Sequence, residues 1–317
     1  MPQTKTIMNN LARWFDSEAV PDQTTEPDTR FNWVRVMPFI GLHVACLGVI
    51  WVGVSAFAAW FALGFFLVRM FAITGIYHRY FSHKTFTMNR FWQFIFAVLG
   101  TSAVQGGPLW WAAHHRHHHQ HSDSPDDLHS PRQQGFWWSH VGWITCDAAF
   151  PTNHGRVRDW GRFPELRLLN RFDRLVPLLC VVGIYALGEG LAVWAPGLGT
   201  NGPQLVVWGF MISTVALFHA TVSINSLMHV WGRRRFETQD DSRNSFLLSL
   251  LTLGEGWHNN HHRYPNTARQ GFRWWEIDVT FYLLWLLERM HIIRDLKPIP
   301  ENIRNETLER DRQRRKG

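Results

Sequence analysis

Long uncharged apolar runs alternate with polar segments along the chain. No Asp, Glu, Lys or Arg occurs from Val36 to Val68, and the apolar character resumes after Arg69 as far as Tyr77. Because about 20 helical residues cross the hydrocarbon core of a bilayer, this run is long enough for two crossings. It predicts a hairpin of two transmembrane helices that turns near residues 53–55.

A second apolar pair follows a long polar segment. Leu175 to Trp194 contains one charged residue, Glu189, and Leu205 to Ile224 contains none. A stretch rich in Pro and Gly, Pro196 to Pro203, separates the two. The alternative, four core helices of a soluble protein, is disfavoured because soluble cores rarely sustain such runs. We therefore expect spans near residues 36–54, 57–77, 175–194 and 205–224.

These patterns predict an all-α integral membrane protein with four transmembrane helices and a cytoplasmic helical cap. Three shorter apolar stretches end too soon to span a bilayer, and we expect them to form amphipathic helices at its surface: Phe91 to Val104, Phe246 to Leu253 and Ile277 to Leu287. The expected organisation is an N-terminal segment 1–35, a membrane domain 36–290 and a basic C-terminal tail 291–317.

The positions of Lys and Arg predict the orientation. Both hairpin turns lack them, whereas the N-terminus, the segment from His78 to Arg174 and the chain after Gly232 carry nearly all of them. The positive-inside rule then places both termini and the active site on the cytoplasmic side of a multi-pass protein, in the inner membrane if the source is bacterial. The first 30 residues contain no apolar stretch of signal-peptide length.

Composition adds that the chain is basic and rich in His and aromatic residues. The 317 residues carry a formal net charge of +7, with 18 His and 18 Trp. Arginines cluster at Arg233 to Arg235 and near the C-terminus, outside apolar segments, which favours anionic lipid headgroups over nucleic acid as the partner. The three cysteines are too widely spaced for a CxxC metal site and imply no disulfide framework.

Nine histidines, counted without His117, form three tight groups and one outlier. The groups are HRYFSH from His78 to His83, HRHHH from His115 to His119 and HNNHH from His258 to His262, and the outlier His229 lies four residues after Asn225. Since each helical residue turns by about 100°, each of the last two groups can present two imidazoles to one point and a third to a neighbouring point. His78 and His83 would diverge by about 140° on one α-helix, so both reach one metal only if the helix ends or bends between them.

This number of imidazoles predicts a metal centre. Imidazole suits iron, zinc, copper or nickel. Nine ligands are too many for one ion but sufficient for two ions with four or five each and an open position. The predicted topology agrees, because the exits of the second and fourth spans and both polar segments lie on one side of the membrane.

The other histidines are expected to contribute less. Ordinary surface or core positions are expected for His43, His121, His140, His154 and His291. On a helix, the residues that flank the second group point away from the ligands, and these are His114 and His117. Intermediate cases, which could support the ligands, are His129 and His219.

The motifs and their surroundings resemble the membrane fatty acyl desaturases. The resemblance covers roughly Val36 to Trp275 and extends beyond the histidines to Thr74-Gly75-Ile76, Ser139-His140-Val141-Gly142-Trp143 and Gly254-Glu255-Gly256-Trp257. The pair Asn225 and His229 is similar to the stearoyl-type, delta-9 acyl-CoA branch. Membrane alkane hydroxylases also use three histidine motifs, but theirs have other spacings and a first motif rich in His and Glu, which this chain lacks.

The resemblance implies a di-iron centre with O₂ as co-substrate. One iron would be held by His78, His83, His115, His119 and His261. The other would be held by His118, His229, His258 and His262, with Asn225 reaching it through water. The implied reaction removes two hydrogens from a saturated C16 to C18 acyl chain and gives a cis double bond at or near carbon 9. No flavin, nicotinamide, haem or iron–sulfur motif is evident, which implies a separate electron donor of ferredoxin or cytochrome type with its reductase.

Two acyl carriers remain open. Before the second histidine group, the animal acyl-CoA enzymes carry a basic and an acidic residue that meet the CoA headgroup, where this chain has Ala113 and His114. After the Trp143 motif they carry a basic pair, where this chain has Asp147 and Ala148. These differences remove charge-assisted contacts to phosphate. A phospholipid-bound acyl chain therefore competes with acyl-CoA, which the family as a whole favours slightly.

Two other functions also remain open. A hydroxylase on the same scaffold differs only in the fate of the substrate radical. A His-rich membrane protein for metal binding or transport would also be basic, but it predicts ionisable residues along a path through mid-membrane, whereas these histidine groups lie at one face.

Overall fold

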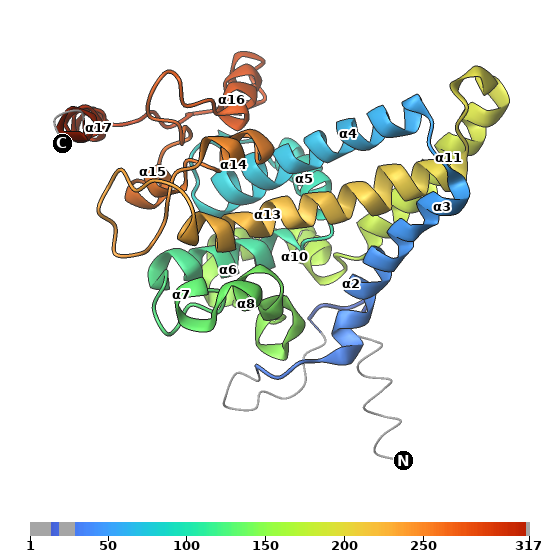
Figure 1. The fold of residues 1–317 in the computed structure, drawn as a ribbon, viewed down its shortest axis with the longest axis horizontal. Helices are drawn as coiled ribbons and strands as arrows, with labels where there is room; N and C mark the ends of the chain where they lie inside the picture. The colour runs from blue at the N-terminus through green and yellow to red at the C-terminus, as the bar shows by residue number, and fades with distance from the viewer. Residues whose placement is uncertain (1–13, 19–28, 315–317) are drawn as a thin grey trace.

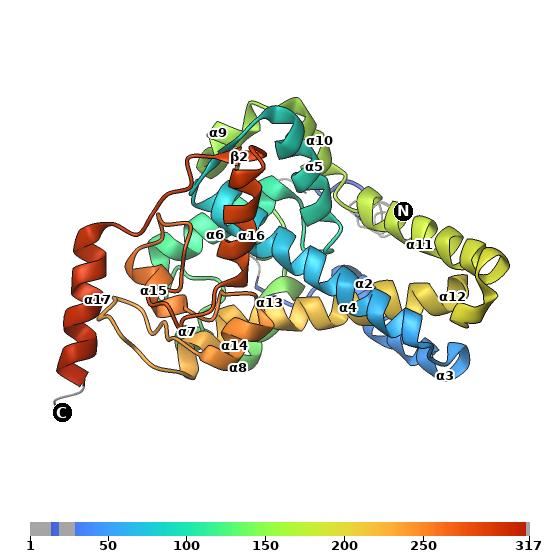
Figure 2. The same ribbon diagram turned by 90° about the horizontal axis from the view of Figure 1, so that it is seen from above.

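The computed structural model describes residues 14–18 and 29–314. The predicted N-terminal segment 1–35 lies mostly outside the described residues. Nearly all regular structure in the described part is helical, and one short antiparallel ribbon pairs β1 (Thr87–Met88) with β2 (Ile293–Arg294). Long apolar helices extend from a cap of shorter helices (Figure 1, Figure 2).

The first predicted hairpin forms around a turn at residues 53–55. Gly53 has a φ of 62°, a left-handed conformation that glycine adopts without strain. The Ser55 side chain then accepts a hydrogen bond from the backbone N–H of Ala58 and caps the next helix. The elements are α2 (Trp33–Ala45), the 3₁₀ turn η1 (Cys46–Gly48), α3 (Val49–Val52), α4 (Ala56–Phe71) and the π-helix η2 (Ala72–Ser82).

The second apolar pair packs its two arms closely. A Cβ atom on Gly188 would stand 2.6 Å from backbone atoms of Asn201, so only glycine permits this approach. Asn201 in turn caps the following helix by accepting from the Gln204 N–H. The elements are α11 (Leu175–Trp194), η6 (Pro196–Leu198), α12 (Gly202–Leu205), the π-helix η7 (Val206–Ile212) and α13 (Ser213–Val230).

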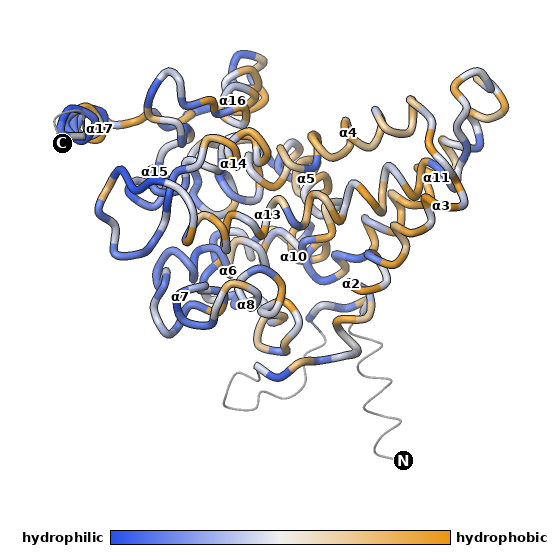
Figure 3. The backbone as a smooth tube through the Cα atoms, viewed as in Figure 1, coloured by the Kyte–Doolittle hydropathy of each residue, from blue (hydrophilic) through white to orange (hydrophobic). Residues whose placement is uncertain are grey.

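Among the described residues, three helical segments are long and apolar enough to cross a membrane, where the sequence predicts four. They are Ala56–Ser82, Leu175–Trp194 and Gly202–Val230. The predicted span 36–54 corresponds to the apolar helix Val36–Val52, formed by the end of α2, η1 and α3, which follow one another without a break. Hydrophobic residues concentrate along the long helices and polar residues in the cap (Figure 3). Trp51 and Trp194 are 79% and 85% exposed at the far ends of their helices, as expected for interfacial anchors.

The cap surrounds the inner ends of the long helices. The three stretches predicted to lie at the membrane surface are helical, as α5 (Arg90–Thr101), α14 (Phe246–Leu251) and α16 (Val279–Arg289). Much of the predicted C-terminal tail is also a helix, which packs Ile303 against Phe236 and Phe272. The other elements are α6 (Pro108–His121), α7 (Pro131–Gln134), α8 (Phe136–His140), η3 (Gly142–Thr145), η4 (Asp147–Ala149), η5 (His154–Val157), α9 (Arg158–Gly161), α10 (Pro164–Arg171), α15 (His258–Arg263) and α17 (Glu301–Arg314).

Candidate metal centre

The nine predicted histidine ligands lie on four helices that meet inside the cap. The π-helix η2 carries His78 and is followed directly by His83, and His229 lies at the end of α13. The remaining six belong to α6 and α15. The structure brings all nine into two neighbouring groups, so the convergence that the sequence predicts is present in the fold.

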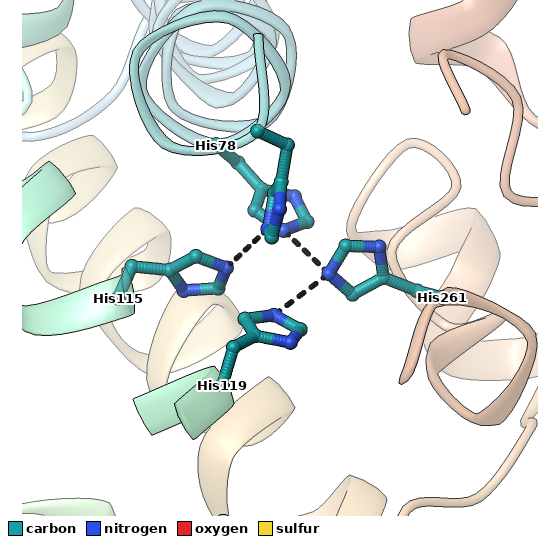
Figure 4. A group of neighbouring side chains, drawn as sticks. His78, His115, His119 and His261 are labelled. Atoms are coloured by element: carbon teal, nitrogen blue, oxygen red, sulfur yellow. Dashed lines mark hydrogen bonds between the residues drawn. The ribbon is translucent and has the colours of Figure 1, made fainter. Parts of the chain in front are cut away.

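The first group contains five imidazoles from three helices and the residue that follows η2. One ring nitrogen of each member lies within 4.8 Å of those of the others: His78, His83, His115, His119 and His261. Figure 4 shows rings from different elements turned toward a common centre. The Nε2 atom of His261 lies 3.0 Å from that of His78 and 2.9 Å from that of His119. Nε2 of His261 carries either one proton or one lone pair, so it cannot donate to both neighbouring nitrogens. A cation bound among these ring nitrogens would instead accept the lone pair of each of them.

The π-helical turn explains how His78 and His83 share one centre. The backbone N–H of His83 donates to the carbonyl of His78 over 3.2 Å, which closes a turn between residues five apart. The helix also ends at Ser82, as the predicted geometry requires. The ring centroids of His78 and His83 are therefore 4.9 Å apart, and the 140° divergence expected for an α-helix does not arise.

The second group contains four imidazoles, those of His118, His229, His258 and His262, with one ring nitrogen each within 4.8 Å of the others. The Nε2 atoms of His229 and His258 are 3.1 Å apart. The Nε2 atoms of His118 and His262 are buried and have no hydrogen-bond partner among the described residues. Buried polar atoms are costly when they lack a partner, so these nitrogens fit a second cation.

Four carboxylates orient the ligands from behind. The Nδ1 atoms of His118, His229 and His262 lie 3.0, 2.7 and 2.6 Å from Asp127, Asp123 and Asp240 respectively. The Nδ1 atom of His78 lies 2.6 Å from Glu255. An Nδ1–H that donates to a carboxylate leaves Nε2 as the free acceptor, which is the form that binds metal. The arrangement is thus built for coordination through Nε2.

Electrostatics keep several other ligands neutral. Burial, and then the neighbouring imidazoles, hold the pKa values of five histidines well below the ordinary range: His83, His115, His119, His258 and His261. Burial alone would raise the pKa of Glu255, but the charges of His78 and Arg79 lower it to about 2. Neutral imidazoles flanked by ionised carboxylates match the requirements of a divalent metal.

Sequence reasoning did not single out these carboxylates. Asp123 lies four residues after His119, and Asp127 lies four residues after Asp123. Glu255 lies three residues before His258. Closeness to the histidine motifs in sequence could therefore have indicated these three carboxylates. Asp240 has no such signal, because the fold alone brings it to His262. Arg79, fully buried between Glu255 and Asp278 at 2.9 Å from each, was also not predicted.

The remaining histidines fall into four sets. His129 packs against His118 with ring centroids 4.5 Å apart and planes tilted by 38°, and it lies near Asp127, which extends the second group. The two residues that flank the α6 ligands, His114 and His117, lie outside both ligand groups, and burial lowers the pKa of His114 to about 4. No ligand group in the described residues includes His121, His154 or His291. His43, His140 and His219 instead contact one another.

An apolar cavity begins beside the two groups. Its wall includes His78, His115 and His258, and the half-buried Asn225, one helical turn before His229. Much of the rest is apolar, including Ile73, Trp110, Trp111, Phe218 and Val222. Besides Glu255, its charged lining residues are Asp173, whose pKa burial raises to about 6, and Arg174. Such a cavity suits a long hydrocarbon chain.

Comparisons with known proteins agree with this site. The sequence pattern of the fatty acid desaturase family matches residues 53–291. The chain is 35% identical to the sn-2 palmitoyl-lipid 9-desaturase of Nostoc sp. (strain 36), over 88% of this chain and 94% of that protein. It is 33% identical to the sn-1 stearoyl-lipid 9-desaturase of Synechocystis sp., over 92% of this chain and 88% of that protein. It is also 33% identical to an acyl-CoA 5-desaturase of Anemone leveillei, over 91% of this chain and 88% of that protein.

The fold and the site define a helical protein with apolar helices of membrane-spanning length and buried histidine clusters able to bind metal. The chain belongs to the fatty acid desaturase family, which confirms the resemblance seen in its motifs. It is an oxidoreductase that desaturates fatty acyl chains.

Proposed function

We propose that the protein holds two iron ions and uses O₂ to place a cis double bond at or near carbon 9 of a saturated C16 to C18 acyl chain. The observation that carries this proposal is the pair of histidine groups beside one apolar cavity. The two groups would hold one iron each, and Asn225 would reach the second iron through water. Bound iron would supply the oxidising power that an unactivated C–H bond requires.

The protein itself contributes orientation and exclusion of water. The carboxylates of Asp123, Asp127 and Asp240 hold three imidazoles in place from behind. The tryptophans and aliphatic residues of the cavity wall guide an acyl chain past His115 and His258. A dry, shaped site of this kind selects two adjacent carbons and limits side reactions.

A lipid-bound acyl chain is the proposed substrate. Ala113 is buried, Asp147 accepts hydrogen bonds from Asn32, and Arg174 is the only arginine or lysine that lines the described cavity. Arg234 and Arg235 bond within the cap, to Asp241 and to Glu276, and do not line the cavity. Within the cavity, little positive charge is therefore available to the phosphates of CoA. The names of the relatives from Nostoc and Synechocystis, both lipid 9-desaturases, support the same carrier and position.

Electrons would come from a separate ferredoxin or cytochrome-type donor with its reductase. The proposal rests on the sequence, which contains no recognisable motif for a flavin, a nicotinamide, a haem or an iron–sulfur cluster.

The test is product analysis in a desaturase-deficient host that receives a pulse of labelled stearate. Gas chromatography with mass spectrometry should show delta-9 monounsaturated chains with the wild type and with His154→Ala, but none with His118→Ala. Label should enter phospholipid as saturated chains and become unsaturated afterwards. Unsaturated label that appears first in acyl-CoA would contradict the carrier, and a hydroxylated product would favour the hydroxylase alternative.

A further inference from the structure

Three histidines outside the metal groups form a continuous hydrogen-bonded chain across α2, α13 and α8. The Nε2 atom of His43 lies 3.1 Å from Nε2 of His219, and Nδ1 of His219 lies 3.1 Å from Nε2 of His140. At one end, Nδ1 of His43 lies 2.8 Å from the carbonyl oxygen of Phe39. At the other end, Nδ1 of His140 lies 2.9 Å from Oγ of Ser226.

When all three rings are neutral, only one assignment of their protons gives every hydrogen bond one donor and one acceptor. A carbonyl only accepts, so His43 carries its proton on Nδ1. His219 then donates from Nε2 to His43, and His140 donates from Nε2 to Nδ1 of His219. The remaining Nδ1 of His140 accepts from the hydroxyl of Ser226.

The chain can take up one more proton without losing a ring contact. The Ser226 hydroxyl has a second acceptor, the carbonyl oxygen of Val222 at 2.9 Å. When the hydroxyl turns to Val222, Nδ1 of His140 becomes the donor to Ser226 and the three rings hold four protons. The extra charge moves from His140 to His219 to His43 when one proton crosses each N–N contact. Hydroxyl rotation is thus the only rearrangement that uptake requires.

The two ends of this chain face different surroundings. His43 lines the apolar cavity together with Phe39. His140, on the short helix α8, does not line this cavity, and like His43 and His219 it is half-buried. The chain therefore connects α8 of the cap to the cavity wall, and release at the cavity end breaks one hydrogen bond, from Nδ1 of His43 to Phe39.

We propose that His140, His219 and His43 form a relay that carries protons into the cavity during turnover. The inference rests on the oxygen chemistry proposed above. Forming one double bond takes two hydrogens from the acyl chain, two electrons from a one-electron donor protein and two protons from solution, and it reduces one O₂ to two waters. An apolar cavity excludes bulk water, so these protons need a path, and three imidazoles in contact provide one.

The test uses the iron-loaded enzyme with a reduced donor and the variant His219→Gln. The Gln amide can hydrogen-bond to the rings of His43 and His140, which preserves the contacts of α13 with α2 and α8. An amide does not, however, accept a proton at one atom and release one from another as an imidazole does. Turnover should fall by roughly 10- to 100-fold at unchanged KM and iron content. The solvent deuterium isotope effect on kcat should rise, and more of the electrons should leave as hydrogen peroxide. His154→Gln, at a histidine outside the chain, should match the wild type in all these readouts.

Two outcomes would overturn the relay. One is wild-type turnover, isotope effect and coupling in His219→Gln. The other is slow turnover with lost iron and an unchanged isotope effect, which would show that His219 only holds the helices together. If His219→Gln does not fold, His140→Gln at the α8 end gives the same comparison. A wild-type enzyme that consumes no O₂ would instead contradict the proposed function.

Discussion

Hydrogen bonds to carboxylates decide which nitrogen of His78, His118, His229 and His262 faces the centre of its group. His262 shows this most clearly, because Asp240 lies 2.6 Å from its Nδ1 while its Nε2 is buried without a partner among the described residues. A neutral imidazole has two tautomers, and only one of them directs a lone pair to the centre. The carboxylates would therefore contribute to metal affinity without contacting the metal.

We predict that Asp240→Asn weakens iron binding by about 10- to 100-fold, the usual effect of removing a partner behind a ligand. The amide can still contact Nδ1, but it no longer fixes the tautomer by charge. Iron affinity is measured by competition with a chelator, using purified protein in detergent.

Asp126→Asn is the matched control for this prediction. Asp126 is 75% exposed and its carboxylate lies 3.7 Å from His121, which belongs to no ligand group in the described residues. Its iron affinity should equal that of the wild type. Equal affinities in all three proteins would show that Asp240 does not orient His262.

At the scale of elements, helix type and close helix contacts place the ligands. The π-helix η2 gives His78 and His83 a common face, which an α-helix would not. Gly188 lets α11 approach the start of α12 to within backbone contact. Periodicity along the sequence indicates neither feature, since both depend on which partner a helix meets.

We predict that Gly188→Ala destabilises the second helical pair by about 1 to 3 kcal/mol, because the added Cβ would stand 2.6 Å from the backbone of Asn201. Gly183→Ala, on the same helix, meets nothing within 4 Å and should be neutral or stabilising by up to about 1 kcal/mol. Thermal unfolding of both variants in detergent measures the difference. Equal unfolding temperatures would contradict the close contact.

At the scale of the molecule, the apolar helices point away from a polar cap that contains both histidine groups (Figure 1, Figure 3). Charge asymmetry in the sequence predicts that the cap is cytoplasmic and that the loop between α11 and α12 is on the far side. Gly197 in this loop is exposed and has no atoms near its Cβ position, so a cysteine is tolerated there.

We predict that Gly197→Cys reacts with a membrane-impermeant thiol reagent only from the non-cytoplasmic side. The background replaces Cys46, Cys146 and Cys180 with serine. Gln239→Cys, at an exposed position in the cap, should react only from the cytoplasmic side. Labelling of both positions from the same side would refute the orientation.

The sequence by itself determined the apolar segments, the helical fold class and the nine histidines. Hydrophobic runs and metal-binding motifs are local, and each can be read without knowing its neighbours. The second apolar pair shows this, because the predicted limits of the third span, 175–194, coincide with α11. In the first hairpin, the apolar helix Val36–Val52 lies within the predicted span 36–54.

The tertiary structure alone decided which nitrogens converge, which carboxylates orient them and where the cavity runs. Asp240 lies 22 residues before His262 in sequence, and His43 and His219 are 176 residues apart, yet each pair is in contact. From the sequence, His43 and His140 are expected at ordinary positions and His219 as an intermediate case that could support the ligands, and nothing indicates that the three are in contact. Such contacts depend on how helices pack and rotate against one another, and side-chain spacing within one segment carries no information about that.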